Sequence, residues 1–167
     1  MPKIRGFEVV SKDFRTAFNI LTDEKKNKIS IPVDIKLPTR ADERSAGYDF
    51  YAPKDVQILP GHTVVIFTDV KAYMQPDEVL KIYIRSSLAI KKGLVLSNGV
   101  GIIDSSYYNN PDNDGNIAIA IKNTSGTAVN ITAGDRIAQG IFVKYLTADE
   151  DIKLNTERTG GIGSSGE

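Results

Sequence analysis

The sequence contains no cysteine, and its only histidine is His62. Without cysteine the chain has no disulfide, no thiolate nucleophile and no Cys-ligated metal site. A single histidine excludes a multi-histidine zinc site and leaves His62 as the only base for a Ser-His-Asp triad, although its place after a Pro-Gly pair predicts an exposed turn residue. An enzyme with this composition works with carboxylates, hydroxyls, arginine and a hard metal ion.

An excess of either charge is also absent, because 21 Lys and Arg residues stand against 21 Asp and Glu residues. A module that binds duplex nucleic acid normally has a basic excess, so no nucleic acid partner is expected. No apolar run approaches the roughly 20 residues that span a bilayer, so no membrane partner is expected. The N-terminal residues lack the apolar core of a signal peptide. These absences together predict a cytoplasmic protein.

The 167 residues fit one domain, which is long enough to bury a hydrophobic core. Apolar and polar residues alternate with a period of two over residues 29–37, 79–84 and 116–123, and residues 62–70 and 137–145 are rich in β-branched and aromatic side chains. Turn-forming residues separate these runs about every ten positions. The pattern predicts an all-β sandwich or barrel.

Residues 1–28 do not fit the strand pattern clearly and are interpreted as an extension. Phe14, Phe18 and Leu21 have helical spacing, so the extension is either one short helix or a docked segment. Residues 109–115 contain only turn-forming residue types and predict a loop.

The C-terminal residues 158–166 are rich in glycine and serine. A disordered terminus is the simplest interpretation. The same composition also suits a flexible phosphate clamp, because glycine exposes backbone N–H groups while Arg158 and the serines add donors.

Two candidate sites stand where apolar runs end. Arg85, Ser86 and Ser87 follow the run 79–84, where the strand gives way to a turn, and they offer hydrogen-bond donors to an anion. Asp104 ends a second apolar run, where it suits a general base acting on water or a ligand of a cation. The structural alternatives are a polar strand end for the first and a turn cap for the second.

Other polar or aromatic residues have two interpretations each. Asp49 interrupts an apolar strand, and a buried carboxylate needs partners, so it is either structural or part of a metal site. Tyr107 follows the candidate base and either supports a sugar or base or packs as a half-buried strand residue. Asp135 and Arg136 are neighbours and predict a local salt bridge.

Taken in order, these features resemble the five motifs of the dUTPase family (dUTP nucleotide diphosphohydrolases) of the trimeric, all-β type. The matching segments are Ala-Gly-Tyr-Asp-Phe-Tyr-Ala at 46–52, Arg-Ser-Ser-Leu-Ala at 85–89, Asn-Gly-Val-Gly-Ile-Ile-Asp-Ser-Ser-Tyr at 98–107, Gly-Asp-Arg-Ile-Ala-Gln at 134–139 and the tail at 158–166. The resemblance covers about residues 30 to 166. Five motifs in the right order are far more specific than any one of them.

The resemblance implies a jelly-roll-like β-barrel or sandwich that forms a homotrimer with exchanged C-terminal arms. Residues 1–157 would form a single domain, and residues 158–167 would form a flexible arm that closes over the active site. Each site would take motifs one, two and four from one subunit, motif three from a second and the arm from a third.

The implied reaction is hydrolysis of dUTP to dUMP and pyrophosphate with Mg²⁺, which keeps uracil out of DNA and supplies dUMP for thymidylate synthesis. Asp104 would activate the water that attacks the α-phosphorus, and Tyr107 would pack under the deoxyribose. Asp49 would act on the metal through water. The remaining contacts implied by the motifs are uracil recognition by Asn98, Ile102, Ile103 and Ala118, and phosphate binding by Arg85, Ser86, Ser87 and Gln139.

The arm residues implied to close over the nucleotide are Arg158, Gly161, Ile162, Gly163, Ser164 and Ser165. Ile162 stands where the family usually has an aromatic residue that stacks on uracil, so weaker base contact is expected. Six residues, 109–114, are inserted beside Tyr107 relative to the family pattern. They suit a longer hairpin tip, a contact between subunits or a surface for a partner.

Three alternatives differ in function. A regulatory protein with the dUTPase fold would bind a protein partner through residues 109–114. A dCTP deaminase shares the fold but needs a glutamate where Ala120 stands, so deamination is rejected. A jelly-roll capsid protein would not explain the ordered motifs.

Overall fold

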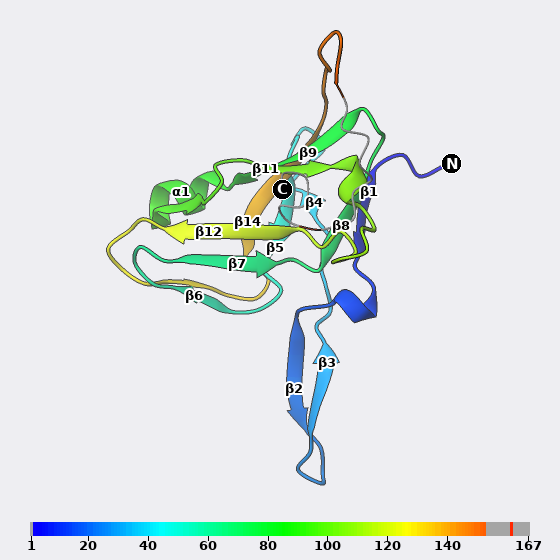
Figure 1. Ribbon diagram of the computed structural model, residues 1–167. Coiled ribbons are helices and arrows are strands. Elements are labelled where there is room, and N and C mark those ends of the chain that lie inside the picture. The colour runs from blue at the N-terminus through cyan, green and yellow to red at the C-terminus, as the bar shows by residue number, and fades with distance from the viewer. Residues whose placement is uncertain (1, 153–160, 162–167) are drawn as a thin grey trace.

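The computed structural model describes residues 2–152 and Gly161, and this part of the chain is built mainly from short strands (Figure 1). In chain order the elements are β1 (Gly6–Val9), η1 (Lys12–Phe14), β2 (Phe18–Thr22), β3 (Lys28–Pro32), β4 (Thr39–Arg40), β5 (Tyr48–Tyr51), β6 (Val56–Ile58), β7 (Thr63–Phe67), β8 (Val70–Tyr73), β9 (Glu78–Ile84), α1 (Ser86–Lys92), β10 (Leu94–Leu96), β11 (Gly101–Asp104), η2 (Ser105–Tyr107), β12 (Ala118–Asn123), β13 (Val129–Ile131) and β14 (Arg136–Lys144). The predicted all-β class is confirmed.

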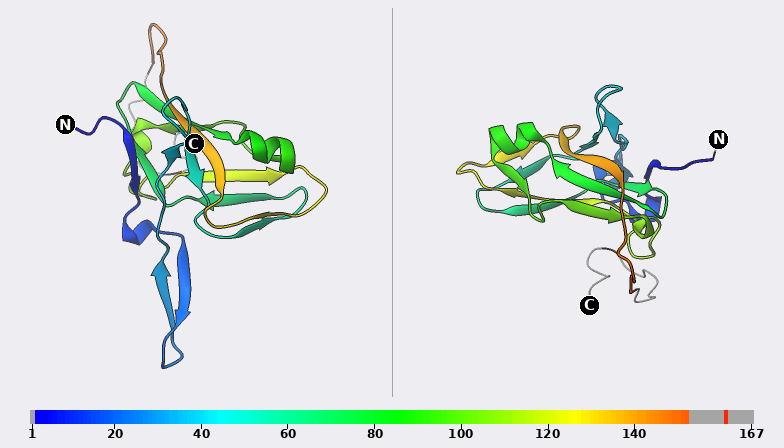
Figure 2. Two further views of the ribbon diagram at one scale, coloured as in Figure 1. Left: turned by 180° about the vertical axis from the view of Figure 1, so that it is seen from behind. Right: turned by 90° about the horizontal axis from the view of Figure 1, so that it is seen from above.

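Two antiparallel sheets form the two layers of the body. The larger has the strand order β11-β9-β14-β5-β4, and the smaller has the order β10-β12-β7. Seen from above, the two layers lie over one another with α1 at one end (Figure 2). The pairs β13–β6 and β1–β8 extend the structure at its margins. This arrangement agrees with the all-β sandwich that the periodicity predicts and with the jelly-roll-like fold that the resemblance implies.

The hydrophobic core lies between the layers and follows the predicted period of two. In β9, Leu80 and Ile82 are buried, and in β12, Ile119 and Ile121 are buried and alternate with more exposed residues. Successive residues of a strand point to opposite faces, so alternate positions supply one side of the core. Phe50 of β5 is fully buried in the same cluster.

The extension is a hairpin, not a helix. Residues Lys12–Phe14 form one turn of 3-10 helix, and β2 and β3 then pair as a hairpin that projects from the body (Figure 1). All residues of both strands are exposed. The helical interpretation of the spacing is therefore wrong, because the first aromatic residue lies in the 3-10 turn and the other two apolar residues lie on a strand. The strand predicted over 29–37 ends at Pro32 and belongs to this hairpin.

A buried carboxylate fixes the base of the hairpin. Asp69 is fully buried between β7 and β8 and accepts hydrogen bonds from the backbone N–H groups of Thr16 and Ala17 at 2.9–3.0 Å. Asn116 donates to the same carboxylate at 2.9 Å, and Arg15 lies 3.4 Å from it. These contacts fix the base of the β2–β3 hairpin to the body. They also supply the hydrogen bonds and the charged partner that a buried carboxylate requires.

No helix among residues 2–152 is long and apolar enough to cross a membrane.

The core predicts one sensitive position, Gly140 in the middle of β14. A Cβ atom there would lie 2.9 Å from Phe50, 3.0 Å from Leu80 and 3.1 Å from Ile82, all of them buried side chains. Gly140→Ala should therefore overpack the core and lower the free energy of unfolding by about 1–3 kcal/mol, measured by urea denaturation. Gly126→Ala is the control, since nothing lies within 4 Å of its added Cβ; equal stability of the two variants would contradict the prediction.

Candidate active site

Three of the predicted motifs meet at the carboxylate of Asp49. Arg85 Nε lies 3.0 Å from Asp49 Oδ1, and Arg136 Nη1 donates to Asp49 Oδ2 at 3.2 Å. The three residues come from β5, the end of β9 and the start of β14, which are adjacent strands of the larger sheet. Asp49 is only 7% exposed, so the two guanidinium groups supply the partners that a buried carboxylate requires.

Gln139 lies beside this cluster because of strand register. It stands opposite Asp49 of β5 on one side and opposite Tyr83 of β9 on the other. Its side chain lies over Gly47, where an added Cβ would come within 2.6 Å of Gln139 Oε1. Glycine at this position of the first motif leaves room for the glutamine side chain.

The second motif begins a helix, so the predicted turn after Arg85 is wrong. Ser86 and Ser87 are the first two residues of α1, and Arg85 is its N-cap residue. The helix ends at Gly93, which has the left-handed φ of 64° that favours glycine. The combination of two lysines followed by glycine is a C-terminal helix signal that the strand-and-turn interpretation overlooked.

This helix makes one wall of a cationic pocket. Arg85, Ser87 and the α1 residues Lys91 and Lys92 line it, and Arg136 closes it from β14. Asp135 is the one acidic residue in the lining. Four basic groups around one hollow, with a hydroxyl among them, suit a polyanion such as a chain of phosphates.

Three of these basic residues were missing from the predicted site: Lys91, Lys92 and Arg136. The predicted salt bridge between Asp135 and Arg136 is wrong, because Arg136 pairs with Asp49 while Asp135 accepts the backbone N–H of Thr132 at 2.9 Å. No local signal identifies the true partner of Arg136, which lies 87 residues away in the sequence.

The third motif lies on the edge of the larger sheet. Ile102, Ile103 and Asp104 belong to β11, which pairs on one side with β9. Asp104 is exposed at the end of this strand and is the N-cap residue of η2. An exposed carboxylate at an edge is accessible to water and to a ligand.

Asn98 and Ala118 border the same region. Asn98 is exposed in the connection between β10 and β11, and these two strands diverge into different sheets. Ala118 is the first residue of β12 and pairs with Phe67. The third motif therefore runs from the connection after β10, in the smaller sheet, to the edge strand of the larger sheet.

Tyr107 is held firmly in the same region. Its side chain is only 5% exposed, and its hydroxyl donates to the carbonyl of Asn116 at 2.9 Å and accepts from Asn113 Nδ2 at 2.8 Å. The ring belongs to the core cluster. The Tyr107 ring is therefore packed into the core and exposes little of its surface to a ligand.

The two groups of predicted residues lie apart on one face of the sheet. Asp104 of β11 pairs with Val79 of β9. Asp49 of β5 pairs with Gln139 of β14, which in turn pairs with Tyr83 of β9. Val79 and Tyr83 are four residues, or about 13 Å, apart along β9. The strands β11 and β5 are three strand spacings, or about 14 Å, apart in the sheet, so the carboxylates of Asp104 and Asp49 are separated by about 20 Å. Asp49 is next to the buried Phe50 and Asp104 is next to Ile103, which packs against the core. Because successive strand residues point to opposite faces, both carboxylates lie on the face turned away from the core. One chain therefore does not bring the two groups together.

The arm residues Arg158, Ile162, Gly163, Ser164 and Ser165 lie outside the described residues. Gly161 is described, and its backbone N–H donates to Asp112 Oδ2 at 3.1 Å. The arm motif thus has one residue beside the insertion that follows Tyr107.

Mg²⁺ fits the donors of this site in one way only. Among the described residues no three His, Cys, Asp or Glu side chains converge as a metal site. Both oxygens of Asp49 contact arginine. Mg²⁺ usually keeps several waters and binds through one or two carboxylates and the phosphates of a substrate, so Asp49 suits contact with the ion through water.

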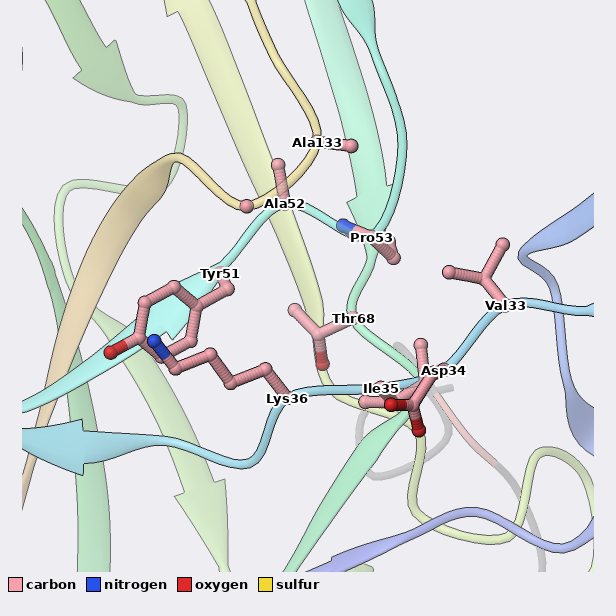
Figure 3. A pocket seen from close by; sticks show the side chains of 10 residues that line it. Val33, Asp34, Ile35, Lys36, Tyr51, Ala52, Pro53, Thr68 and Ala133 are labelled. Carbon is pink, nitrogen blue, oxygen red and sulfur yellow. The ribbon is translucent and has the colours of Figure 1, made fainter.

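A second pocket lies between residues 33–36 and the end of β5 (Figure 3). Tyr51, Thr68 and Ala133 contribute to its lining, and Lys36 Nζ lies 4.0 Å from the centre of the Tyr51 ring. None of the predicted site residues lines this pocket. The cationic pocket beside Arg85 is therefore the stronger candidate for an anionic substrate.

Comparison with known proteins points to one family. The family model described as dUTPase matches residues 33–166. The chain is similar to a deoxyuridine 5'-triphosphate nucleotidohydrolase of Lactococcus lactis, with 46% identity over 165 residues, 98% of this chain and 99% of that protein. It is also similar to the enzyme of that name from Haemophilus ducreyi, with 39% identity over 140 residues, 80% of this chain and 88% of that protein.

Solved structures agree in fold. A dUTPase from Streptococcus mutans matches with a TM-score of 0.69 and 42% identity, covering 86% of this chain and 98% of that one. A mutant dUTPase from phage phi11 of S. aureus, with a structural Mg(II) ion, matches with a TM-score of 0.66 and covers 93% of this chain and 99% of that one. At 21% identity the second likeness shows the fold alone.

The cationic pocket predicts that a small polyphosphate binds to it and that Arg136 contributes. Arg136→Gln removes one charged donor from a side chain that is 46% exposed, and Arg85 still pairs with Asp49, so the fold should tolerate it. We expect the affinity for inorganic tripolyphosphate, measured by isothermal titration calorimetry, to fall about tenfold. Arg44→Gln removes an exposed charge away from the pocket and should leave affinity unchanged; equal affinities of both variants would exclude the pocket as the binding site.

Proposed function

The chain belongs to the dUTPase family, and from this premise we propose that it hydrolyses dUTP to dUMP and pyrophosphate at a site shared between copies of the chain. The observation that carries the proposal is the meeting of three family motifs at Asp49, Arg85 and Arg136, beside a pocket lined by four basic residues. A triphosphate is the polyanion that such a pocket suits. The product dUMP would serve thymidylate synthesis, and removal of dUTP would keep uracil out of DNA.

The cationic pocket is assigned to the phosphates. Arg85, Ser87 and Gln139 line or border it and would donate to phosphate oxygens, with Ser86 at the start of the same helix. Phosphoryl transfer depends mainly on positioning and on stabilising charge. Mg²⁺ bound to the triphosphate would neutralise part of its charge, and Asp49 would hold that ion through water.

The third motif is assigned to the water and the nucleoside. Asp104 would take a proton from water as the water oxygen bonds to the α-phosphorus. The bond from the α-phosphorus to the bridging oxygen then breaks, and pyrophosphate leaves. The Tyr107 ring is held in place because its hydroxyl bonds to the carbonyl of Asn116 and to Nδ2 of Asn113. A fixed wall of this kind would exclude a 2′-hydroxyl, while Asn98 and the backbone of β11 near Ile102 would read uracil.

A second copy of the chain supplies what one copy lacks. The third motif lies about 20 Å from the Asp49 cluster of the same chain, which is too far for both to contact the reacting phosphate. Both groups lie on the outer face of the sheet, where another copy can approach. A closed homotrimer built this way contains three equivalent sites, and the arms at 158–167 would complete them by exchange.

The regulatory alternative gains no support from the insertion. Asn110 and Asp114 are buried there and bond to residues of the same chain. Hydrolysis remains the proposed function, and we expect it to take place in the cytoplasm.

Pyrophosphate release with Mg²⁺ should be fastest for dUTP among dUTP, dTTP, dCTP and UTP. Asp104→Asn should keep affinity for a non-hydrolysable dUTP analogue and lower kcat by about a hundredfold or more, because the base is lost. Asp13→Ala, which removes an exposed charge elsewhere, is the control. Failure of the folded wild-type protein to release pyrophosphate from dUTP would overturn the proposal, and unchanged kcat in Asp104→Asn would reject the role of that residue.

Mixed trimers test the shared site directly. An Asp104→Asn chain and an Arg85→Gln chain should each be nearly inactive alone. When they are denatured together and refolded, each mixed trimer contains one intact site, so activity should rise to about a quarter of the wild-type value. A site contained in one chain would give no such recovery.

A further inference from the structure

The residue assigned to the deoxyribose, Tyr107, is held by the backbone of Asn116. The Tyr107 hydroxyl donates to the carbonyl oxygen of Asn116 at 2.9 Å. Asn116 lies two residues before the first residue of β12 and is only 1% exposed. The position of the carbonyl that Tyr107 uses therefore depends on how Asn116 is anchored inside the body.

A fully buried carboxylate anchors Asn116 through two reciprocal hydrogen bonds. The backbone N–H of Asp69 donates to Asn116 Oδ1 at 2.9 Å, and Asn116 Nδ2 donates to Asp69 Oδ1 at 2.9 Å. Asp69 lies between β7 and β8, so the pair joins that connection to the segment that leads into β12. Two bonds between the same residues restrict both the position and the orientation of Asn116.

The backbone of Asp69 has an unfavourable conformation. Its φ is 56°, in the left-handed region that residues other than glycine adopt rarely. The backbone carbonyl accepts the N–H of Val10 at 3.0 Å, and the backbone N–H is bonded to Asn116. Conformations of this kind persist where the surrounding contacts enforce them, and they cluster at functional sites. Glycine would relieve the strain, so an aspartate here indicates a task for its carboxylate.

The N-terminal extension supplies the other partners of that carboxylate. Thr16 donates to it through its backbone N–H at 2.9 Å and through its hydroxyl at 2.7 Å, and Ala17 donates its N–H at 2.9 Å. Arg15 Nε lies 3.4 Å from the same carboxylate. Asp69 therefore stands between the extension and Asn116, and a segment far from Tyr107 in the sequence takes part in its support.

We propose that Asp69 and Asn116 are positioning residues for sugar selection. They hold the carbonyl that fixes the Tyr107 hydroxyl, and so keep the ring where it leaves no room for a 2′-hydroxyl. The inference rests on the proposed function for its effect on substrate choice, and on geometry alone for the support of Tyr107. It also gives residues 15–17 of the extension a task, since they complete the surroundings of Asp69.

The ratio of kcat/KM for dUTP to kcat/KM for UTP tests the proposal. Loss of folded protein lowers both values by the same factor and leaves their ratio unchanged. Asn116→Ala removes both reciprocal bonds, so the ratio should fall about tenfold. An unchanged ratio would overturn the proposal.

Asn123→Ala is the matched control. Asn123 is also fully buried, and its Nδ2 donates to the carbonyls of Ile58 and Thr127. Its loss should lower the thermal midpoint and leave the ratio of dUTP to UTP turnover as in the wild-type protein. An equal fall of the ratio in Asn123→Ala and Asn116→Ala would show a general loosening of the fold and overturn the proposal.

Exchanging the two side chains tests the pair itself. Asp69→Asn alone sets two amide groups against each other, and Asn116→Asp alone sets two carboxylates against each other, so each should lower the ratio about tenfold. In the chain with both substitutions, the amide at position 69 donates to the carboxylate at position 116, and the Thr16 hydroxyl can turn to accept. Most of the wild-type ratio should return. A double variant no better than the single variants would contradict the pair.

A second cycle tests whether the pair acts through Tyr107. Tyr107→Phe removes the hydroxyl that Asn116 holds and should lower the ratio by itself. In the Tyr107→Phe background, Asn116→Ala should cause no further fall. An equal loss in both backgrounds would show that Asn116 acts by another route and overturn the proposal.

Failure of the proposed function has a separate sign. If the wild-type protein does not hydrolyse dUTP, the proposed function fails, and hydrogen exchange of the backbone amides at 107–116 decides whether the pair supports Tyr107. Exchange should become about tenfold faster in Asn116→Ala and stay as in the wild-type protein in Asn123→Ala. Unchanged exchange in Asn116→Ala would overturn the support of Tyr107.

Discussion

The carboxylate of Asp49, shared between Arg85 and Arg136, is the interaction on which the site depends. A buried carboxylate without partners would be costly, and the two guanidinium groups stabilise it. The same pairing places both arginines in the lining of the cationic pocket. Because the three residues lie on three adjacent strands, the order β9-β14-β5 is what makes the cluster possible.

Sheet geometry also underlies the proposal that the site is shared between copies of the chain. Strand spacing and register are fixed by backbone hydrogen bonds, so Asp104 cannot approach the Asp49 cluster of its own chain. The outer face of the sheet presents both groups to neighbouring molecules. Within one chain, the insertion contacts two other motifs. Asp112 accepts a hydrogen bond from the Gly161 N–H, and Asn113 donates one to the Tyr107 hydroxyl.

The sequence predicted the core strands well and the margins poorly. Alternation in β9 and β12 predicts buried faces because a sandwich core selects every second residue. The same alternation misleads in residues 29–37, where the strand is an exposed hairpin and apolar residues face no core of their own chain. The helix α1 was missed because seven residues are too few for a clear helical period, although Gly93 marks its end.

By itself the sequence determined the residue types available for chemistry, the period-two core and the five ordered motifs. Those properties are local, so they can be read along the chain. The tertiary structure decided which distant residues meet: Arg136 with Asp49, and Gly161 with Asp112. It also separated Asp104 from Asp49. Contacts of this kind depend on strand order and register, which arise from packing of the whole chain and leave no mark at a single position.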